Sequence, residues 1–170
     1  GMDLPLAVMV TIPAPWEHDK YMDSEIKDFY RYYATMMEPW DGPASILFTD
    51  GDVVGAILDR NGLRPSRYYI TDDGYMILSS EVGAIDIDQT KVIKKDRLRP
   101  GKMLLVDTVE GKMVSDEELK LRYAEKNPYG EWLDSNLVEL DDLKVPNQAA
   151  PTLTKEERLR LQKTYGYTYE

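Results

Sequence analysis

The stretch EPWDGPASILFTDGDVVGAILDRNGLRPSRYY, from Glu38 to Tyr69, decides the fold of this chain. It contains two apolar runs, Ala44 to Thr49 and Val53 to Leu58, which are joined by Asp50-Gly51. Asp-Gly tolerates the positive φ angles that a two-residue turn between antiparallel strands requires. The pattern therefore predicts a β-hairpin built from these two runs.

Two more strands are expected after the hairpin. Asn61-Gly62 supplies a second turn, and Pro65 favours an extended backbone for the residue before it. Strands are then predicted at Arg67 to Thr71 and at Tyr75 to Ser79, with Asp73-Gly74 as the turn between them. Because about forty residues hold four consecutive strands and no crossover helix, we expect a mostly antiparallel sheet.

A helix is predicted before the strand-rich region. Asp23 or Ser24 can cap a helix that runs through Glu38. Its apolar residues recur every three or four positions, and we interpret this face as core in preference to a partner or cofactor groove. The members of the face are Ile26, Phe29, Tyr30, Tyr33, Met36 and Met37.

The remaining segments give further elements. Capping boxes begin two helices near the C-terminus, and Asn127-Pro128 separates the first of them from a shorter helix. The predicted elements are helices at 115–126, 131–138 and 154–165 and a strand at 103–107. The apolar run Leu4 to Ile12 suits either a strand or a helix, and the basic segment 91–98 has no assigned form.

Composition indicates a folded protein without thiol chemistry. The 170 residues are 42% hydrophobic, which suffices for one buried core. There is no cysteine, so disulfides and thiolate metal sites are excluded. The one histidine, His18, follows Trp16 and Glu17 in a polar turn. We interpret it as a surface or packing residue in preference to a metal ligand or general base.

Charge and hydropathy exclude several classes of partner. The net charge is −10 and the isoelectric point is about 4.7, so nucleic-acid binding is not expected. No segment suits a membrane span or a signal peptide, and we expect a cytoplasmic protein. The segment Arg60 to Lys102 is a basic exception, with nine basic and six acidic residues. We interpret it as a solvated edge in preference to a docking face for an anionic partner.

Metal binding is not expected either. Asp50-x-Asp52 imitates the start of an EF-hand loop, but Val54 and Asn61 occupy positions that need oxygen ligands from acidic side chains. The carboxylate pairs Asp86/Asp88 and Asp141/Asp142 have no companion general acid in sequence, and both are expected to face solvent.

Three motifs carry a resemblance to a known family. EPWDGPA, DRNGLRPSRY and, from Ser79 to Gly83, SSEVG are similar to the large chain of glutamate synthase, within its class II glutamine amidotransferase domain. The similarity extends from about Leu4 to the closing LQKTYGYTYE. It implies an α+β fold with a mostly antiparallel sheet and flanking helices, part of the αββα sandwich of N-terminal-nucleophile hydrolases.

The resemblance also implies which part of the domain is present. In this family the nucleophile is an N-terminal cysteine, and an Asn-Gly pair within His-Asn-Gly-Glu-Ile-Asn forms the oxyanion hole. Neither occurs here, so we expect the C-terminal half of the domain, with no nucleophile, oxyanion or glutamine-binding residue. The expected organisation is a domain half at 1–145, a linker at 146–153 and a terminal helix at 154–170 that leads out of the domain.

The function implied is a part of the glutaminase module that supplies ammonia from glutamine for glutamate formation from 2-oxoglutarate. The isolated chain is expected to be inactive and to hold no cofactor, since FMN and an iron–sulfur cluster belong to other domains of the family enzyme. Expected partners are the N-terminal half of the domain, the synthase domains and a second copy, paired through strand edges of the hairpin 44–58 and the run 4–12. The alternative is a non-catalytic scaffold or partner-docking module derived from that domain.

A last group of residues is assigned a structural or docking role. Its members are Arg60, Asn61, Gly62, Arg64, Arg67 and Glu81. Guanidinium groups bind carboxylate or phosphate in a bidentate manner, or pair with acidic groups inside the protein. Internal pairing with Asp59, Glu81 or Asp41 is favoured, and Arg64 is expected to brace the hairpin through such a pair.

Overall fold

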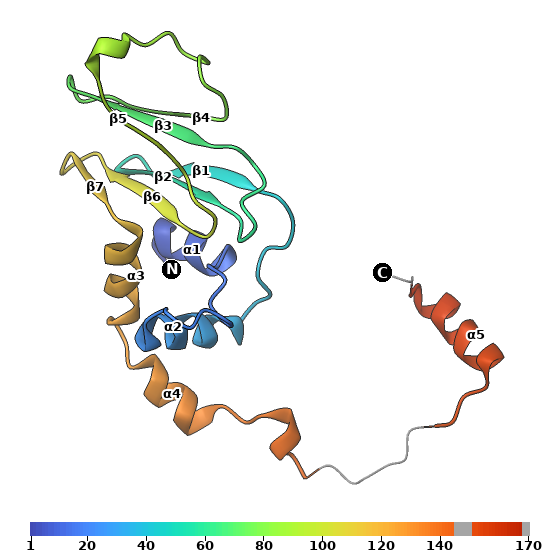
Figure 1. The fold of residues 1–170 in the computed structure, drawn as a ribbon. Coiled ribbons are helices and arrows are strands. Elements are labelled where there is room, and N and C mark those ends of the chain that lie inside the picture. The colour runs from blue at the N-terminus through green and yellow to red at the C-terminus, as the bar shows by residue number, and fades with distance from the viewer. Residues whose placement is uncertain (145–150, 168–170) are drawn as a thin grey trace. The chain divides into compact units, whose positions relative to one another are not determined.

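The computed structural model describes residues 1–144 and 151–167. The chain divides into two compact units, Gly1–Leu137 and Val138–Glu170 (Figure 1). The boundary proposed at residue 145 and most of the predicted linker, 146–150, lie outside the described residues. No helix among the described residues has both the length and the apolar character needed to cross a membrane.

A four-stranded antiparallel sheet lies at the centre of the first unit (Figure 1). Its strands are β1 (Ser45–Thr49), β2 (Val53–Leu58), β6 (Met103–Asp107) and β7 (Lys112–Val114), in the order β1-β2-β6-β7. The predicted hairpin is confirmed as β1 and β2, and the predicted strand at 103–107 is confirmed as β6. The carboxylate of Asp50 fixes the hairpin turn by accepting a hydrogen bond from the backbone N–H of Val53 at 2.9 Å.

A glycine in β2 allows an aromatic ring to lie across the hairpin. Gly55 is the cross-strand partner of Phe48, and a Cβ at Gly55 would overlap the Phe48 ring. The ring therefore covers the glycine backbone, which compensates for the missing side chain in the strand.

A second, three-stranded antiparallel sheet has the order β4-β3-β5. Its strands are β3 (Arg67–Thr71), β4 (Met76–Ser79) and β5 (Val92–Arg97). The first two confirm the predicted strands, with β4 one residue shorter at its start. The segment 91–98 forms an edge strand, although four of its last five residues are charged and all of them are exposed.

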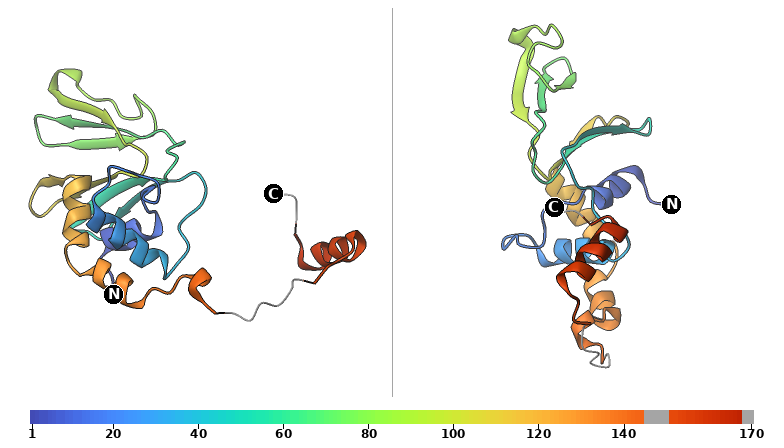
Figure 2. Two further views of the ribbon diagram at one scale, coloured as in Figure 1. Left: turned by 60° about the horizontal axis from the view of Figure 1, so that its bottom comes forward. Right: turned by 90° about the vertical axis from the view of Figure 1, so that its right-hand side faces the viewer.

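Four helices lie on the side of the four-stranded sheet that is opposite the second sheet. They are α1 (Leu4–Thr11), α2 (Ser24–Ala34), α3 (Asp116–Ala124) and α4 (Tyr129–Asn136). Figures 1 and 2 show the helices, the four-stranded sheet and the three-stranded sheet as successive layers. The α+β class with antiparallel sheets and flanking helices is therefore confirmed, with an α–β–β order in Gly1–Leu137.

The apolar run at the N-terminus is a buried helix. Asp3 caps α1 by accepting a hydrogen bond from the N–H of Leu6 at 3.0 Å, and a proline occupies the first turn, where its missing N–H costs nothing. Met9 is 1% exposed and belongs to the main hydrophobic core. The expectation that the run 4–12 offers a surface for self-association is wrong, because the helix buries its apolar side chains inside the unit.

Helix α2 ends earlier than predicted. It begins after Asp23, as expected, but it ends at Ala34 instead of Glu38. Phe29 at its centre is fully buried, whereas Met36 and Met37 lie beyond the helix end and are 56% and 44% exposed. The last part of the predicted apolar face is therefore not core.

The second unit holds a short 3₁₀ helix, Leu140–Asp142, and α5 (Lys155–Tyr165). The predicted capping box is confirmed: the Thr154 hydroxyl accepts the N–H of Glu157, and the Glu157 carboxylate accepts the N–H of Thr154 at 2.8 Å. Gly166 ends the helix with φ of 70°, in the left-handed region that glycine favours.

Candidate functional site

Three of the residues expected to carry structural roles, Arg60, Asn61 and Gly62, lie where the hairpin leaves the four-stranded sheet. Asp59 directly follows β2, and its side chain is buried at 2% exposure. Its carboxylate accepts hydrogen bonds from the backbone N–H of Ala44 at 3.1 Å and of Asn61 at 2.9 Å. One carboxylate therefore ties the entry of β1 to the turn after β2.

The pKa of Asp59 reflects two opposing effects. Burial disfavours the charged carboxylate and raises its pKa, while hydrogen bonds from the N–H groups of Ala44, Asn61 and Gly62 favour the charged form. The hydrogen bonds outweigh the burial, and the pKa of Asp59 lies below its ordinary value. Asp59 is a charged anchor of the backbone and not a general acid.

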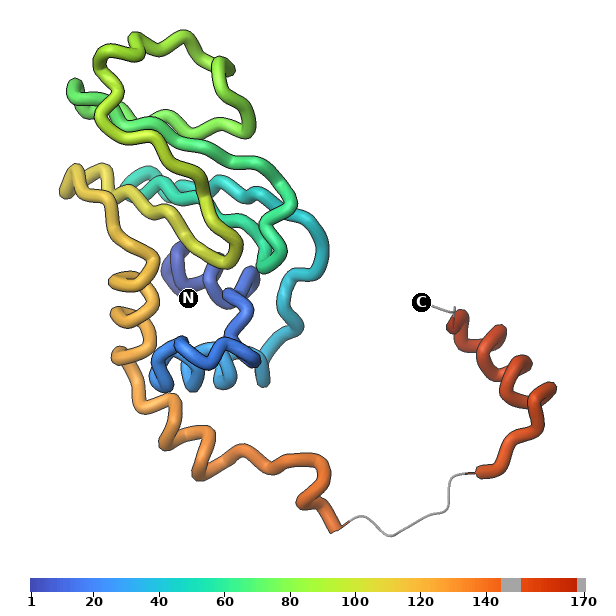
Figure 3. Tube along the Cα trace, in the orientation of Figure 1, coloured from blue at the N-terminus to red at the C-terminus, as the bar shows by residue number. Residues whose placement is uncertain are grey.

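The Asn61-Gly62 turn is locked against a second turn distant in sequence. Gly62 has φ of 61°, and a Cβ at this position would overlap the ring of Pro100. The N–H of Gly101 also donates to the carbonyl of Asp59 at 3.4 Å. Figure 3 shows the two turns side by side. Glycine is needed at position 62 both for its backbone conformation and for this close approach.

A buried ion pair holds the second turn from the other side. Lys120 of α3 donates to the Asp116 carboxylate at 2.7 Å and to the carbonyl of Gly101 at 3.0 Å. Asp116 also accepts the backbone N–H of Met103 at 2.8 Å. Desolvation lowers the pKa of Lys120, and the charge of Asp116 opposes that effect. The pair joins α3 to β6 and to the turn that contacts Gly62.

The arginines behave differently from the expected brace. Arg60 pairs with Asp41 at 3.4 Å, and both side chains are exposed. Arg64 and Arg67 are exposed and have no ion pair among the described residues. In the described part of the chain it is Asp59 that ties the hairpin, through backbone N–H groups, and the bracing role of Arg64 stays a prediction.

Glu81 is exposed in the connection after β4. Its backbone carbonyl accepts the hydroxyl of Ser79 at 2.6 Å. Within the described residues its carboxylate takes part in no salt bridge, so Glu81 is not joined to the arginine-bearing turn as the sequence had suggested.

The single histidine has no catalytic surroundings in the described part of the chain. His18 is exposed and lines a pocket together with Trp16, Trp40 and Arg60. No serine, threonine or lysine is among the described residues that line this pocket. A nucleophile activated by His18 therefore has no side chain to provide it there.

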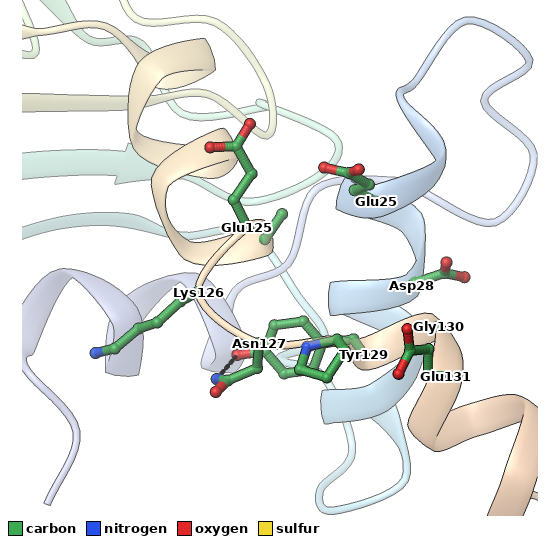
Figure 4. Close-up of a pocket in the computed structure, with 10 residues that line it drawn as sticks. Glu25, Asp28, Glu125, Lys126, Asn127, Tyr129, Gly130 and Glu131 are labelled. Atoms are coloured by element: carbon green, nitrogen blue, oxygen red, sulfur yellow. Dashed lines mark hydrogen bonds between the residues drawn. The ribbon is translucent and has the colours of Figure 1, made fainter.

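A pocket of about 700 Å³ lies where α2, α3 and α4 meet (Figure 4). The carboxylates of Glu25, Asp28, Glu125 and Glu131 surround it, and Asn127 donates to the Tyr129 hydroxyl at 3.0 Å beside them. Among the described residues no group of acidic or histidine side chains is placed to hold a metal ion. The pocket therefore has an acidic rim, and the described residues around it form no metal site.

Sequence reasoning missed the buried polar residues that position this region. In the sequence, Asp116 stands within a helix-capping segment, and no motif singles out Lys120. Their spacing of four residues on one helix was the available signal, since acidic and basic side chains at that spacing pair. Nothing in the sequence indicated that this pair is buried.

Comparisons with known proteins identify the family of this chain. The profile of the family described as glutamine amidotransferases class-II matches residues 1–132. The NADPH glutamate synthase large chain of Bacillus subtilis is 50% identical over 165 residues, which is 95% of this chain and 10% of that protein. The NADH glutamate synthase of Saccharomyces cerevisiae is 44% identical over 178 residues, with 99% and 8% covered. Ferredoxin-dependent glutamate synthase 1 of Arabidopsis thaliana is 42% identical over 167 residues, with 96% and 10% covered.

The chain thus spans about a tenth of the length of these curated relatives. The comparisons do not support its placement in the C-terminal half of the amidotransferase domain. The family match covers nearly all of the unit Gly1–Leu137, including both sheets and helices α1 to α3. This chain therefore belongs to the class II glutamine amidotransferases.

Proposed function

We propose that this chain is part of the glutaminase module of a glutamate synthase. In such an enzyme the module releases ammonia from glutamine, and the ammonia is used to form glutamate from 2-oxoglutarate. Support comes from the family match over residues 1–132 and from the similarity to glutamate synthases over at least 95% of the chain in the three relatives described above. The proposed compartment is the cytoplasm. The chain has no cysteine and therefore lacks the disulfides that are typical of secreted proteins.

The observation that carries the finer proposal is the composition of the chain. It contains no cysteine, so the thiol nucleophile of the family must come from another part of the enzyme. The missing His-Asn-Gly-Glu-Ile-Asn motif gives the same conclusion for the oxyanion hole, which must also come from another part of the enzyme. Its own contribution is the rigid framework around Asp59, Gly62 and the Asp116–Lys120 pair, against which a catalytic segment can be positioned.

The cofactors of the larger enzyme do not fit this chain. An iron–sulfur cluster needs cysteine thiolates, of which there are none, and the sequence has no glycine-rich loop that would cradle a flavin phosphate. We therefore assign FMN and the cluster to other domains. Those domains and the segment that bears the nucleophile are the proposed partners.

An assay of ammonia release tests the missing nucleophile. We expect the 170-residue chain with glutamine to release no more ammonia than the buffer control. Activity that survives repurification and disappears in His18→Ala would overturn the assignment, because it would show a nucleophile that this proposal denies.

A segment exchange tests the membership in a glutamate synthase. The matching segment of the Bacillus subtilis large chain is replaced by this chain, and glutamine-dependent glutamate formation is measured. We expect activity to be retained, and we expect it to fall when the exchanged segment carries Asp59→Asn. A folded chimera with no glutamine-dependent activity would instead favour the alternative, a scaffold or partner-docking module.

A further inference from the structure

A cavity beside the Asn61-Gly62 turn has the composition of an anion site. Its volume is about 280 Å³, the share of roughly nine water molecules in the liquid. None of the described residues that line it is acidic. Three arginines and one serine supply its polar side chains: Arg64, Arg67, Arg97 and Ser66.

Two of the three arginines lie directly opposite each other in the second sheet. Arg67 of β3 and Arg97 of β5 are register partners, so their Cβ atoms are about 5 Å apart on one face of the sheet. Like charges in this arrangement repel each other. Within the described residues no carboxylate compensates either guanidinium, and Arg64 has no ion pair there.

The acidic residue next to Arg97 in β5 makes its hydrogen bond on the opposite face of the sheet. Asp96 is the register partner of Tyr68, and its carboxylate accepts the Tyr68 hydroxyl at 3.3 Å. Because successive side chains of a strand point to opposite faces, Asp96 and Arg97 are separated by the sheet. The arginine pair therefore lacks a neutralising group on its own side.

A buried hydroxyl supplies an independent sign of a missing partner. Ser66 is 4% exposed, and its Oγ has no hydrogen-bond partner in the part of the chain that the structure describes. A buried hydroxyl without a partner is costly, and such groups are rare in native proteins. Ser66 lines the same cavity as the three arginines.

We propose that this cavity binds a small oxyanion with at least two negative charges, held by Arg64, Arg67 and Arg97 and by the hydroxyl of Ser66. Guanidinium forks bind carboxylate and phosphate groups with two parallel hydrogen bonds, and such charge-assisted bonds are strong. The surrounding segment Arg60 to Lys102 carries a positive excess in an acidic chain, which attracts anions to this place. This site is independent of the glutaminase proposal.

Calorimetric titration with two probes tests the site and identifies its chemistry. Succinate and inorganic phosphate are titrated into the 170-residue chain at constant ionic strength, with chloride as the blank. We expect at least one probe to bind with Kd below about 1 mM, and the preferred probe distinguishes a dicarboxylate from a phosphate ligand. If neither probe binds more tightly than chloride, the proposal is overturned.

Variants locate the binding. Arg64→Gln and Arg97→Gln are expected to weaken the preferred probe about tenfold or more, because each removes one charged fork. Arg122→Gln removes the same charge from α3, outside the lining residues, and is expected to leave the affinity unchanged. Equal affinity in all three variants would place the binding elsewhere and would overturn the proposal.

Ser66→Ala separates a ligand contact from a packing role. Without ligand we expect its Tm to equal or exceed that of the parent, since the substitution removes an unpaired hydroxyl. The rise in Tm caused by the preferred probe should be smaller than in the parent, because that rise depends on affinity. A fully retained rise would remove Ser66 from the site and would contradict the proposal as stated.

Discussion

The two faces of the four-stranded sheet are packed to very different extents. On the helix side, sixteen buried residues from the four helices, the connection after α1 and the sheet form one cluster, with Phe29 at 0% exposure. On the side of the three-stranded sheet, the buried cluster among the described residues is Ala56, Leu58 and Leu98. The helical layer therefore contributes most of the apolar burial of this unit.

The face of the four-stranded sheet that points towards the three-stranded sheet is buried at one end only. Leu47 and Val54 share that face with the buried Ala56, yet they are 61% and 46% exposed, and Met113 of β7 is 38% exposed. Stability is expected to differ between the layers, because regions with few buried apolar contacts open more easily. The comparison teaches that two faces of the same sheet can bury very different amounts of apolar surface.

The largest expected effect concerns the helical side. Phe29→Ala should lower the free energy of unfolding by about 3 to 5 kcal/mol, because it leaves a cavity in the main cluster. Leu78→Ala in β4 should cost about 1 kcal/mol, because Leu78 is only partly buried against the small cluster. Urea denaturation of both variants gives the comparison. Equal losses would contradict the unequal packing of the two faces.

The next effect concerns the junction between the layers. Asp59→Asn should lower the free energy of unfolding by about 1 to 3 kcal/mol, since one backbone N–H loses its acceptor in a buried place. The exposed Asp72→Asn serves as the control and should have little effect. A loss in Asp72→Asn as large as in Asp59→Asn would show that net charge, and not the anchor, matters.

The same residue gives a dependence on pH with a defined sign. The pKa of Asp59 is lower in the folded chain than in the unfolded chain, where it is about 3.9. Its stabilisation is therefore fully present above the unfolded pKa and is lost as pH falls through the folded value. Denaturation curves from pH 7 to pH 2 should fall less steeply below about pH 4 for Asp59→Asn than for the parent. Parallel curves would remove Asp59 as a contributor.

A further prediction concerns self-association, which we propose to occur through an exposed strand edge. β1 is an edge strand, and its residue Leu47 is exposed, so two copies can pair there by a two-fold axis. Sedimentation at micromolar concentration should give a dimer for the parent and a monomer for Leu47→Lys. The substitution should change the unfolding free energy of the protomer by less than about 0.5 kcal/mol. A monomeric parent would refute the dimer.

The smallest effect is expected at Arg64. Without an internal partner among the described residues, Arg64→Ala should change the unfolding free energy by no more than about 0.5 kcal/mol. Arg60→Ala breaks an exposed pair with Asp41 and should cost about 0 to 1 kcal/mol. A loss above 2 kcal/mol in Arg64→Ala, measured in the same denaturation series, would restore the brace that the sequence suggested.

Local chemistry was readable from the sequence because it depends on adjacent residues. The position of the hairpin, β3 and the cap of α5 follow from turn residues and capping boxes and are found as expected. The hairpin connection is longer than the expected two-residue turn, because Thr49 pairs with Val54 and only Gly51 of the Asp-Gly pair has a positive φ. The signals for α1 were also present in Asp3 and in Pro5, but an apolar run of this length suits both kinds of element.

Features that depend on distant partners were not readable. β5 carries Lys94, Lys95 and other exposed charges, so its strand character comes from pairing with β3 and not from apolar alternation. The buried Asp116–Lys120 pair resembles an ordinary surface pair until β6 and the turn at Gly101 enclose it. The orphan hydroxyl of Ser66 is likewise visible only after both sheets are in place.

Because Gly62 and Pro100 are in close contact, the effect of substituting one of them depends on which residue stands at the other position. Pro100→Ala should relieve the overlap of a Cβ at position 62 with Cγ and Cδ of the ring, while the Cβ of residue 100 stays 3.0 Å away, and it cannot relieve the positive φ. The left-handed conformation costs a non-glycine residue about 1 to 2 kcal/mol on its own. A double-mutant cycle therefore separates the two reasons for glycine, and two turns far apart in sequence behave as a single coupled unit for substitution.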